Sequence, residues 1–272
     1  MNEKTIQILL TNDDSIHSPG LWAAAQALDL LGFVHIVAPR HQQTGTGHSM
    51  PNTSTGIIET MSLHVNGRDW PVYAVDGTPA QAVVHGIYEV IKSKPDLVVS
   101  GINYGENIGS SITVSGTVGA ALEATSFGIP ALAVSMQTKP EYHLSLSQDI
   151  DFSAAAYFTH KFARVMLNRK FPFDVDVLKV DVPAGASAET PWMITRQSRM
   201  KYYHPEMTQR NSFSEPGPVK YKPNYDPNNL EPDGDTYVLL VDKKVSVTPI
   251  SIDMTSRTDF HQLRRLIEAM DD

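Results

Sequence analysis

The 272-residue sequence contains no cysteine. Disulfide bonds and thiolate metal sites are therefore excluded. Basic residues are also scarce, since 22 Lys and Arg stand against 30 Asp and Glu, and the formal net charge is −8. This balance argues against a general nucleic-acid or membrane-surface binder, which would carry a basic patch. An acidic protein that handles phosphates needs local neutralisation, most simply from a metal ion or from backbone amides.

Long apolar stretches are missing as well, because no run of residues approaches the length of a membrane span. The N-terminal apolar run at 6–10 is too short for a signal peptide and leads directly into two acids. We therefore expect a cytoplasmic protein without a membrane partner. A hydrophobic content of 41% and a charged content of 19% describe an ordinary globular chain, long enough for one large α/β domain or a core with a smaller appended unit.

Short apolar runs alternate with helical patterns over most of the chain before residue 183. The expected buried strands of a parallel sheet lie at 6–11, 34–39, 96–101 and 131–136, and a further strand lies at 176–183. The expected helices lie at 20–32, 79–93, 115–128 and 152–168. A further segment, 57–76, indicates a hairpin beside the sheet. This order predicts βαβ units and a Rossmann-like, three-layer α/β/α catalytic domain with a mostly parallel sheet over residues 1–183.

The character of the chain changes after about residue 150, and apolar runs become few from residue 184. Residues 184–235 are rich in Pro, Asn, Tyr and Gly, but their aromatic residues favour an ordered arm over disorder. Residues 236–250 then predict a hairpin, and 257–270 an amphipathic helix. We expect 184–250 to be an extended arm and hairpin used in oligomerisation, and 251–272 to pack back on the core. Exchange of such an arm between protomers would give a homodimer or homotetramer, whereas an arm folded on its own core would not.

Adjacent acids in the stretch "ILLTNDDSIHSPG", residues 8–20, raise a question of charge. Two neighbouring carboxylates repel one another and are costly to bury, unless both face water or share a cation. In open α/β sheets ligands bind beyond the carboxyl ends of the strands. Polar loops follow expected strands or open an expected helix at 11–14, 38–49, 100–107 and 115–119. An isolated acidic pair is usually a solvated turn, but four such loops favour a shared site.

The residue types in these loops are those of a metal site with oxygen ligands. Asp13, Asp14, Asn103 and Thr44 supply carboxylate, amide and hydroxyl oxygens. Such a hard donor set suits Mg²⁺, Mn²⁺ or Ca²⁺ and is poor for structural zinc.

A second feature is an anion site at the start of the helix expected over 115–128. The turn Ser115–Gly116–Thr117 offers backbone N–H groups and hydroxyls at a helix N-terminus. Plain N-capping by Ser115 is the alternative interpretation. A metal ion beside an anion site indicates metal-assisted phosphoryl transfer to water.

Other catalytic motifs were excluded by single positions. A dinucleotide fingerprint would need glycine where Met50 stands, and a nucleophile elbow would need glycine where Pro51 stands. An aspartyl nucleophile of the D-x-D type is not supported, since the two acids are adjacent. The histidines in these loops are expected at the surface or behind the ligands; they are His17, His41 and His48.

The successive segments "LLTNDDS", "VDGTPA", "SGINYGENIG" and "SGTVGAALEATSFGIPALAVS" resemble, in order and spacing, the motifs of the SurE (survival protein E) family over most of residues 5–136. The resemblance implies a metal-dependent 5′/3′-nucleotidase, acting on nucleoside monophosphates or other small phosphomonoesters with one divalent ion, Mg²⁺ or Mn²⁺. By analogy, the metal ligands fall on Asp13, Asp14, Thr44 and Asn103, and the phosphate contacts near Asn107, Ser115, Gly116 and Thr117. Asp13 would orient or deprotonate the attacking water, and the phosphate contacts would stabilise the charge.

Some positions depart from the family pattern and mark a divergent member. Ser15 stands where glycine is usual, Thr44 where serine is usual, Gln81 where aspartate is usual and Val114 where tyrosine is usual. None of these changes removes a metal-binding oxygen, so they bear on substrate preference more than on hydrolysis. The alternative function is a Rossmann-like binding or assembly module that keeps the site without significant turnover.

Overall fold

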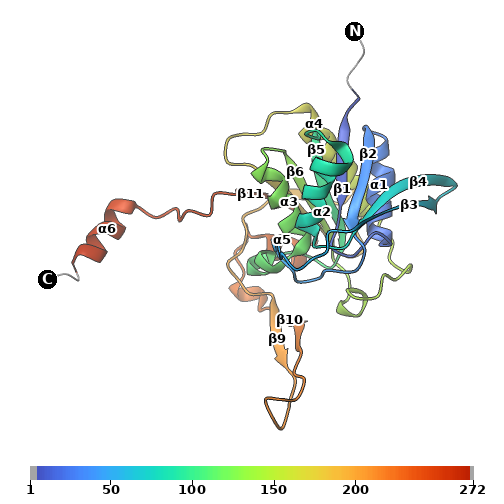
Figure 1. Ribbon diagram of the computed structural model, residues 1–272. Helices are drawn as coiled ribbons and strands as arrows, with labels where there is room; N and C mark the ends of the chain where they lie inside the picture. Colours follow the sequence, from blue (N-terminus) through green and yellow to red (C-terminus); the bar gives the residue numbers. More distant parts are fainter. Residues whose placement is uncertain (1–4, 270–272) are drawn as a thin grey trace.

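The computed structural model describes residues 5–269. Its centre is a nine-stranded sheet with the strand order β3-β4-β2-β1-β5-β6-β7-β11-β8 (Figure 1). The strands are β1 (Gln7–Thr11), β2 (Phe33–Pro39), β3 (Ile58–Val65), β4 (Arg68–Val75), β5 (Leu97–Tyr104), β6 (Ala131–Met136), β7 (Val177–Val182), β8 (Trp192–Ile194) and β11 (Val245–Ile250). Neighbours from β4 through β7 are parallel, whereas β3 and β11 run antiparallel to β4 and β7. The sheet is thus mostly parallel.

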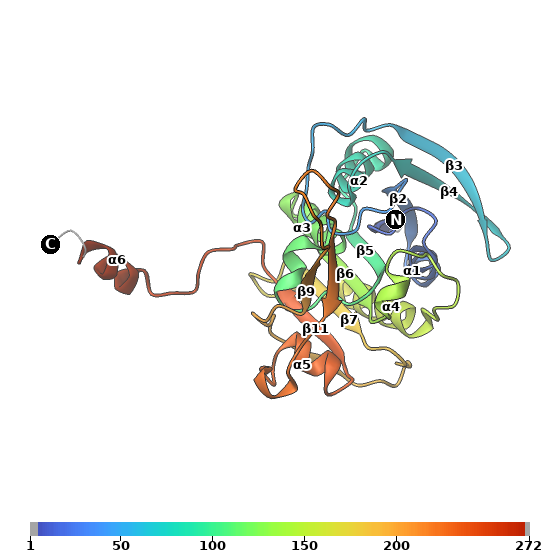
Figure 2. The ribbon, with the colours of Figure 1, turned by 90° about the horizontal axis from the view of Figure 1, so that it is seen from below.

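Helices cover both faces of this sheet. The described helices are α1 (Pro19–Asp29), α2 (Pro79–His85), α3 (Gly116–Ser126), α4 (Ser153–Asn168), α5 (Asp235–Leu240) and α6 (Phe260–Glu268), with a π-helical turn over Gly86–Ile91 after α2, and α6 does not take part in this covering. Figure 2 shows α1 and α4 on one side of the sheet and α2 and α3 on the other. Within residues 5–269, no helix is long and apolar enough to cross a membrane. The expected three-layer α/β/α architecture is confirmed.

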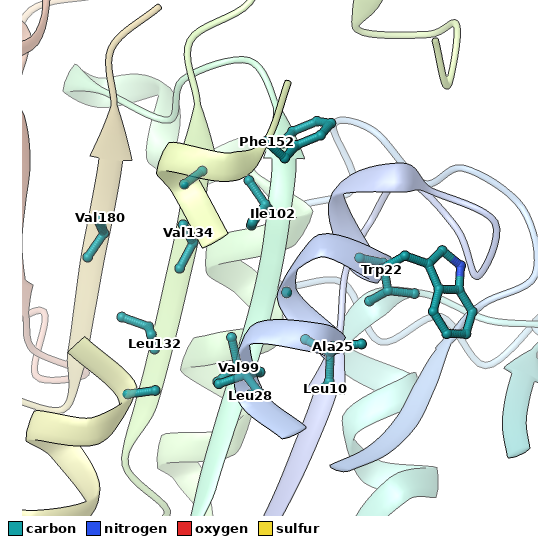
Figure 3. Packing of buried hydrophobic residues seen from close by; sticks show 14 of the residues in the cluster. Leu10, Trp22, Ala25, Leu28, Val99, Ile102, Leu132, Val134, Phe152 and Val180 are labelled. Atoms are coloured by element: carbon teal, nitrogen blue, oxygen red, sulfur yellow. The ribbon is translucent and has the colours of Figure 1, made fainter. Parts of the chain in front are cut away.

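The core lies on the two faces of the central strands. On the face beneath α1 and α4, Leu10, Val99 and Leu132 are fully buried and pack near Trp22 and Phe152 (Figure 3). The alternate residues of the same strands form a second buried cluster with α2 and α3. Burial on both faces explains why these strands read as continuous apolar runs and not as alternating ones.

Residues 57–76 contain the expected hairpin. Strands β3 and β4 pair antiparallel from Ile58↔Val75 to Val65↔Arg68. The connecting residues Asn66 and Gly67 have positive φ values of 49° and 77°. An Asn-Gly pair in this conformation is typical of tight hairpin turns.

The expectation for 236–250 was wrong, because this segment is helix α5 followed by strand β11 and not a hairpin. Val238 and Leu239 are fully buried in α5, and β11 extends the central sheet next to β7. The sheet therefore continues past residue 183, the expected domain boundary. The projecting part of the arm is smaller than expected: it consists of β9 (Tyr203–Met207) and β10 (Val219–Pro223), a separate two-stranded sheet.

The C-terminal helix also differs from expectation. Helix α6 has no buried residue and stands away from the rest of the chain at the end of an extended segment (Figures 1 and 2). Its apolar side chains are exposed: Phe260, Leu263, Leu266 and Ile267. The amphipathic pattern was correct, but such a pattern does not specify which surface covers it. The last residues of the expected unit, 270–272, lie outside the described residues, as do residues 1–4 of the first.

Candidate active site

The two acids of the opening motif lie directly after β1 and are buried. Asp13 is 3% exposed and Asp14 is 1% exposed. A solvated turn, the ordinary interpretation of such a pair, is therefore excluded. Residues 5–269 contain no Lys, Arg or His within ion-pair distance of either carboxylate.

Asp13 contacts the start of α3. The Thr117 hydroxyl donates a hydrogen bond of 2.5 Å to Asp13 Oδ1. Gly116 lies so close that a Cβ on this residue would be 2.8 Å from Asp13 Cβ and 3.0 Å from Asp13 Oδ2. Any larger residue at 116 would collide with the carboxylate. Burial raises the pKa of Asp13 from 3.8 to about 6, although the hydrogen bonds from Thr117 act in the opposite direction.

Asp14 is held by the second loop and by β5. Gln42 Nε2 donates to Asp14 Oδ1 at 2.8 Å, and the Tyr104 backbone N–H donates to Asp14 Oδ2 at 3.0 Å. Burial raises the pKa of Asp14 well above its usual value, and the negative charge of Asp13 raises it further. The two neighbouring carboxyls therefore place electrostatic strain on the fold.

Asn103 reaches this region because β5 is irregular at its end. The ladder between β5 and β6 shifts register between Ser100 and Asn103. Gly101 within the irregularity has φ 129°, and a Cβ there would lie 2.2 Å from the Val134 carbonyl oxygen. Only glycine fits such a conformation and approach. Asn103 Nδ2 donates to the Gly105 carbonyl at 2.7 Å, and this bond leaves the side-chain oxygen as the atom that can serve as a ligand.

Thr44 is on the correct loop, but its side chain is exposed. The loop is tied to the acids through its neighbour, because the Gln43 N–H donates to the Asp13 carbonyl at 2.7 Å. Within residues 5–269, the structure records no hydrogen bond between Thr44 and Asp13, Asp14 or Asn103. The loop and the acids therefore lie together, but the Thr44 hydroxyl forms no hydrogen bond with Asp13, Asp14 or Asn103 in the described chain.

The expected phosphate contacts are divided between two elements. Ser115 Oγ accepts a 3.1 Å hydrogen bond from the Val118 N–H, so Ser115 is the N-cap of α3, as the alternative interpretation held. Asn107 lies farther along, where its Nδ2 donates to Ser135 Oγ at 2.8 Å. The first turn of α3 faces the acids, because both the hydroxyl and the backbone N–H of Thr117 interact with Asp13.

The donor atoms gathered around the two acids are oxygens. Two adjacent buried carboxylates carry negative charge, and three nearby polar atoms (Thr11 Oγ1, Asn12 Oδ1 and Ser100 Oγ) are buried without a hydrogen-bond partner in the described chain. No group of three or more His, Cys, Asp or Glu is placed to hold a metal within residues 5–269. The expected set has only two such residues, completed by amide and hydroxyl oxygens. Its chemistry fits a hard divalent ion.

Beside Ser115, the surface opens into a hollow of ≈ 1040 Å³. His48, Arg196, Arg199 and Arg257 are among its lining residues. Glu231 and Asp253 also line it, and Arg196 is paired with Asp233, so charges of both signs surround the hollow.

Sequence reasoning missed several residues that shape this region. Gln42 binds Asp14, Ser135 binds Asn107, and Asp181 Oδ1 accepts a 2.7 Å hydrogen bond from the Asn107 N–H. The sequence did contain a signal for Asp181, because the buried strand "VLKVDV" has two charged residues on one face. The sequence contained no such signal for Gln42 and Ser135, because isolated polar residues near strand ends are common.

The departures from the family pattern have different structural settings. Gln81 completes a capping box at α2, since its N–H donates to Thr78 Oγ1 and its Oε1 accepts from the Thr78 N–H. Val114 is 57% exposed. Ser15 has φ 93°, a conformation that favours glycine.

We expect Ser15→Gly to stabilise the protein by about 1 kcal/mol, because glycine removes the strain of this backbone angle. The same substitution in an exposed strand position, Ser62→Gly, should destabilise it by roughly 0.5–1 kcal/mol through the entropy of the unfolded chain. Urea unfolding of both variants measures the difference. Equal effects at the two positions would contradict the assignment of strain to Ser15.

Comparisons with known proteins identify the family of the chain. A family model described as "Survival protein SurE" matches residues 8–204. "5′-nucleotidase SurE" of Thermococcus gammatolerans is 42% identical, with 96% of each chain covered, and that of Methanocella arvoryzae is 39% identical, with 97% of this chain and 98% of the relative covered. The crystal structure of a SurE protein from Aquifex aeolicus covers 98% of this chain and 100% of its own, with a TM-score of 0.73 and 30% identity. The chain belongs to the SurE family.

Proposed function

We propose that the protein is a divalent-metal-dependent phosphomonoesterase that hydrolyses nucleoside monophosphates. The observation that carries this proposal is the pair of buried carboxylates, Asp13 and Asp14, without a cationic partner in the described chain and next to the first turn of α3. A cation site and an anion site side by side are what hydrolysis of a phosphate ester requires. The names of the relatives, 5′-nucleotidase SurE, point to the same reaction.

The residues divide into two groups by role. Asp13, Asp14, Asn103 and Thr44 would hold Mg²⁺ or Mn²⁺. When bound, such an ion supplies positive charge to the phosphate and lowers the pKa of a coordinated water. Asp13 would orient or deprotonate the attacking water, a role open to a carboxylate beside the metal-bound water.

The second group would bind the phosphoryl oxygens. Backbone N–H groups of Gly116 and Thr117, together with Ser115 and the Asn107 amide, would stabilise charge that develops on these oxygens. The hollow of ≈ 1040 Å³ beside Ser115 adjoins this turn, although none of the four proposed metal ligands lines it.

Hydrolysis of p-nitrophenyl phosphate with Mg²⁺ or Mn²⁺, against an EDTA control, tests the reaction. A panel of nucleoside 5′- and 3′-monophosphates then identifies the substrate. Metal-dependent turnover supports the proposal. Metal binding without turnover of any phosphomonoester would instead favour the alternative, a binding or assembly module.

The proposed role of Thr44 leads to a specific expectation. Thr44→Ser keeps the oxygen and should retain most activity, whereas Thr44→Val keeps the shape without the oxygen and should lower Mn²⁺ affinity by roughly 10-fold or more. Calorimetry with Mn²⁺ compares the two variants. Equal Mn²⁺ affinity would show that Thr44 is not a ligand.

We also propose that the protein is a homodimer or homotetramer. Two projecting elements expose apolar side chains, namely Met207, Phe213 and Tyr221 around the β9–β10 hairpin and the apolar face of α6. Exposed strand edges and uncovered helix faces favour association with another copy.

Light scattering should give at least twice the monomer mass of 30.0 kDa at micromolar concentration. Glu206 and Lys220 are paired across the hairpin, so residues 207–219 can be replaced by Asn-Gly without altering the base of the arm. This shortened variant, or one that ends at residue 258, should contain fewer copies per assembly than the intact protein. A 30.0 kDa intact protein would contradict the proposal.

A further inference from the structure

Three charged side chains form a buried cluster that the proposed reaction does not use. Lys179 Nζ lies 2.5 Å from Asp181 Oδ2 and 3.2 Å from Asp235 Oδ2. The lysine side chain is 1% exposed, and both carboxylates are fully buried. Lys179 and Asp181 share one face of β7, and Asp235 begins α5. The cluster thus joins the central sheet to the C-terminal part of the chain.

Both carboxylates hold backbone amides of one turn. Asp181 Oδ1 accepts from the Asn107 N–H at 2.7 Å. Both oxygens of Asp235 accept from the Gly109 N–H, each at 3.2 Å. The turn after β5, which carries Asn107, is therefore anchored at two points to side chains that a single ammonium group joins.

The side chain of Asn107 is anchored to the same row of the sheet. Its Nδ2 donates to Ser135 Oγ at 2.8 Å, and Ser135 is the register partner of Asp181 on one side and of Asn103 on the other. The row Asn103–Ser135–Asp181 thus crosses β5, β6 and β7. It places the expected metal ligand Asn103 and the anchors of Asn107 at one level of the sheet.

From this geometry we infer that Asp181, held by Lys179, is a positioning residue for Asn107. Its carboxylate fixes the backbone of the turn 105–109, so that the Asn107 amide stands at a set place relative to Asp13 and Asp14. The inference rests on the proposed function, in which Asn107 contacts the phosphoryl group. Asp181 itself touches neither the substrate nor the metal.

The chemistry of the cluster supports a positioning role. A buried ion pair contributes little net stability compared with well-packed apolar residues, because both charges lose their hydration. A carboxylate with two oxygens can accept from an ammonium and from a backbone N–H at once, which no apolar side chain can do. The small displacement of a substrate-binding group is enough to reduce catalysis, so fixing this turn has a functional consequence.

The test compares Asp181→Asn with Asp181→Ala. Asparagine keeps an oxygen that can accept from the Asn107 N–H, whereas alanine does not. For Asp181→Ala we expect KM for p-nitrophenyl phosphate and the inhibition constant of inorganic phosphate to rise together by roughly 10-fold. Mn²⁺ affinity should stay within about twofold of wild type, and amide deuterium exchange should accelerate at residues 105–110. Asp181→Asn should stay closer to the wild-type values than Asp181→Ala, because its one oxygen can still accept from the Asn107 N–H.

The control is Val180→Ala, a buried change on the opposite face of the same strand. It should lower thermal stability without changing KM or the local exchange at 105–110. If Asp181→Ala does not fold, Asp181→Ser replaces it, since its hydroxyl is too short to take the place of the carboxylate.

Wild-type KM and wild-type exchange in a folded Asp181→Ala protein would overturn the inference. An equal loss of phosphate and Mn²⁺ affinity would overturn it too, since that result indicates general damage to the site. Absence of phosphatase activity in the wild-type protein is a failure of the proposed function alone. In that case the exchange rates at 105–110 still decide whether Asp181 holds the turn.

Discussion

Asp13→Asn and Asp14→Asn are each expected to reduce metal-dependent phosphatase turnover by more than about 100-fold. Loss of an outer partner of a metal ligand costs 10–100-fold, and loss of a ligand oxygen from a site with two carboxylates should cost more. Circular dichroism should show an intact fold, because asparagine has nearly the same shape. Turnover close to wild type in either variant would remove these acids from the metal site.

The same variants should raise the melting temperature of the metal-free protein. The pKa of Asp13 is about 6 in the fold and 3.8 ordinarily. Ionisation of this carboxyl at pH 7 therefore costs the folded state about 3 kcal/mol. Asparagine carries no charge and avoids this cost. Asp69→Asn, at an exposed position, is the matched control and should leave the melting temperature unchanged.

The stability of the metal-free protein should depend on pH with a defined sign. The pKa values of Asp13 and Asp14 are raised in the folded state, so the folded state binds more protons than the unfolded chain above pH 3.8. Their contribution to stability therefore falls as pH rises through the folded pKa values. Thermal unfolding without metal should show a stability loss from this pair between pH 4 and at least pH 6, and saturating Mn²⁺ should reverse it. A metal-free protein whose Asp13→Asn variant shows an unchanged pH profile would contradict this account.

Lys179→Met should destabilise the protein by about 3–5 kcal/mol. Removal of one partner from a buried ionic cluster leaves charge without compensation, and here Asp181 and Asp235 would face each other without the ammonium. Burial alone would lower the pKa of Lys179, but the two carboxylates outweigh it and raise the pKa above its usual value. The lysine is therefore charged at neutral pH, and its stabilising contribution is fully present below pH 10.5.

Urea unfolding at pH 8 and pH 5 measures this effect. The deficit of the Lys179→Met variant should be smaller at pH 5, because burial raises the pKa of Asp181 and protonation removes the uncompensated charge. Lys244→Met is the matched control, since Lys244 forms an exposed pair with Asp242 at 2.8 Å. It should change stability by less than about 1 kcal/mol. Similar losses for both variants would contradict the buried cluster as the cause.

Local pattern was sufficient to predict the central layers of the fold. The five parallel strands β1, β2, β5, β6 and β7 and the helices α1, α3 and α4 lie within a few residues of their expected ranges. Buried strands need continuous apolar residues and surface helices need one apolar face, and both requirements are visible in the order of residues. The position of Asp13 and Asp14 at the end of β1 followed from the same pattern.

The C-terminal part could not be predicted in this way. Strand β11 is an inner strand of the central sheet because β7 and β8 lie on either side of it, and these partners are distant in sequence. Helix α6 has a clear apolar face, yet only the arrangement of the whole chain determines that no surface of this protomer covers it. Periodicity specifies that a face is apolar and says nothing about its partner.

The amino-acid sequence by itself determined the family, the layers of the fold and the acids, amides and hydroxyls available for chemistry, because these depend on residue type, order and spacing. Only the tertiary structure decided which of these groups are buried and what they contact. Burial of Asp13 and Asp14 makes the absence of a neighbouring positive side chain in the described chain significant, and the Lys179 cluster links β7, α5 and the Asn107 turn. Hydration and hydrogen bonding set the free energy of a charge, and both depend on neighbours that the fold brings from distant parts of the chain.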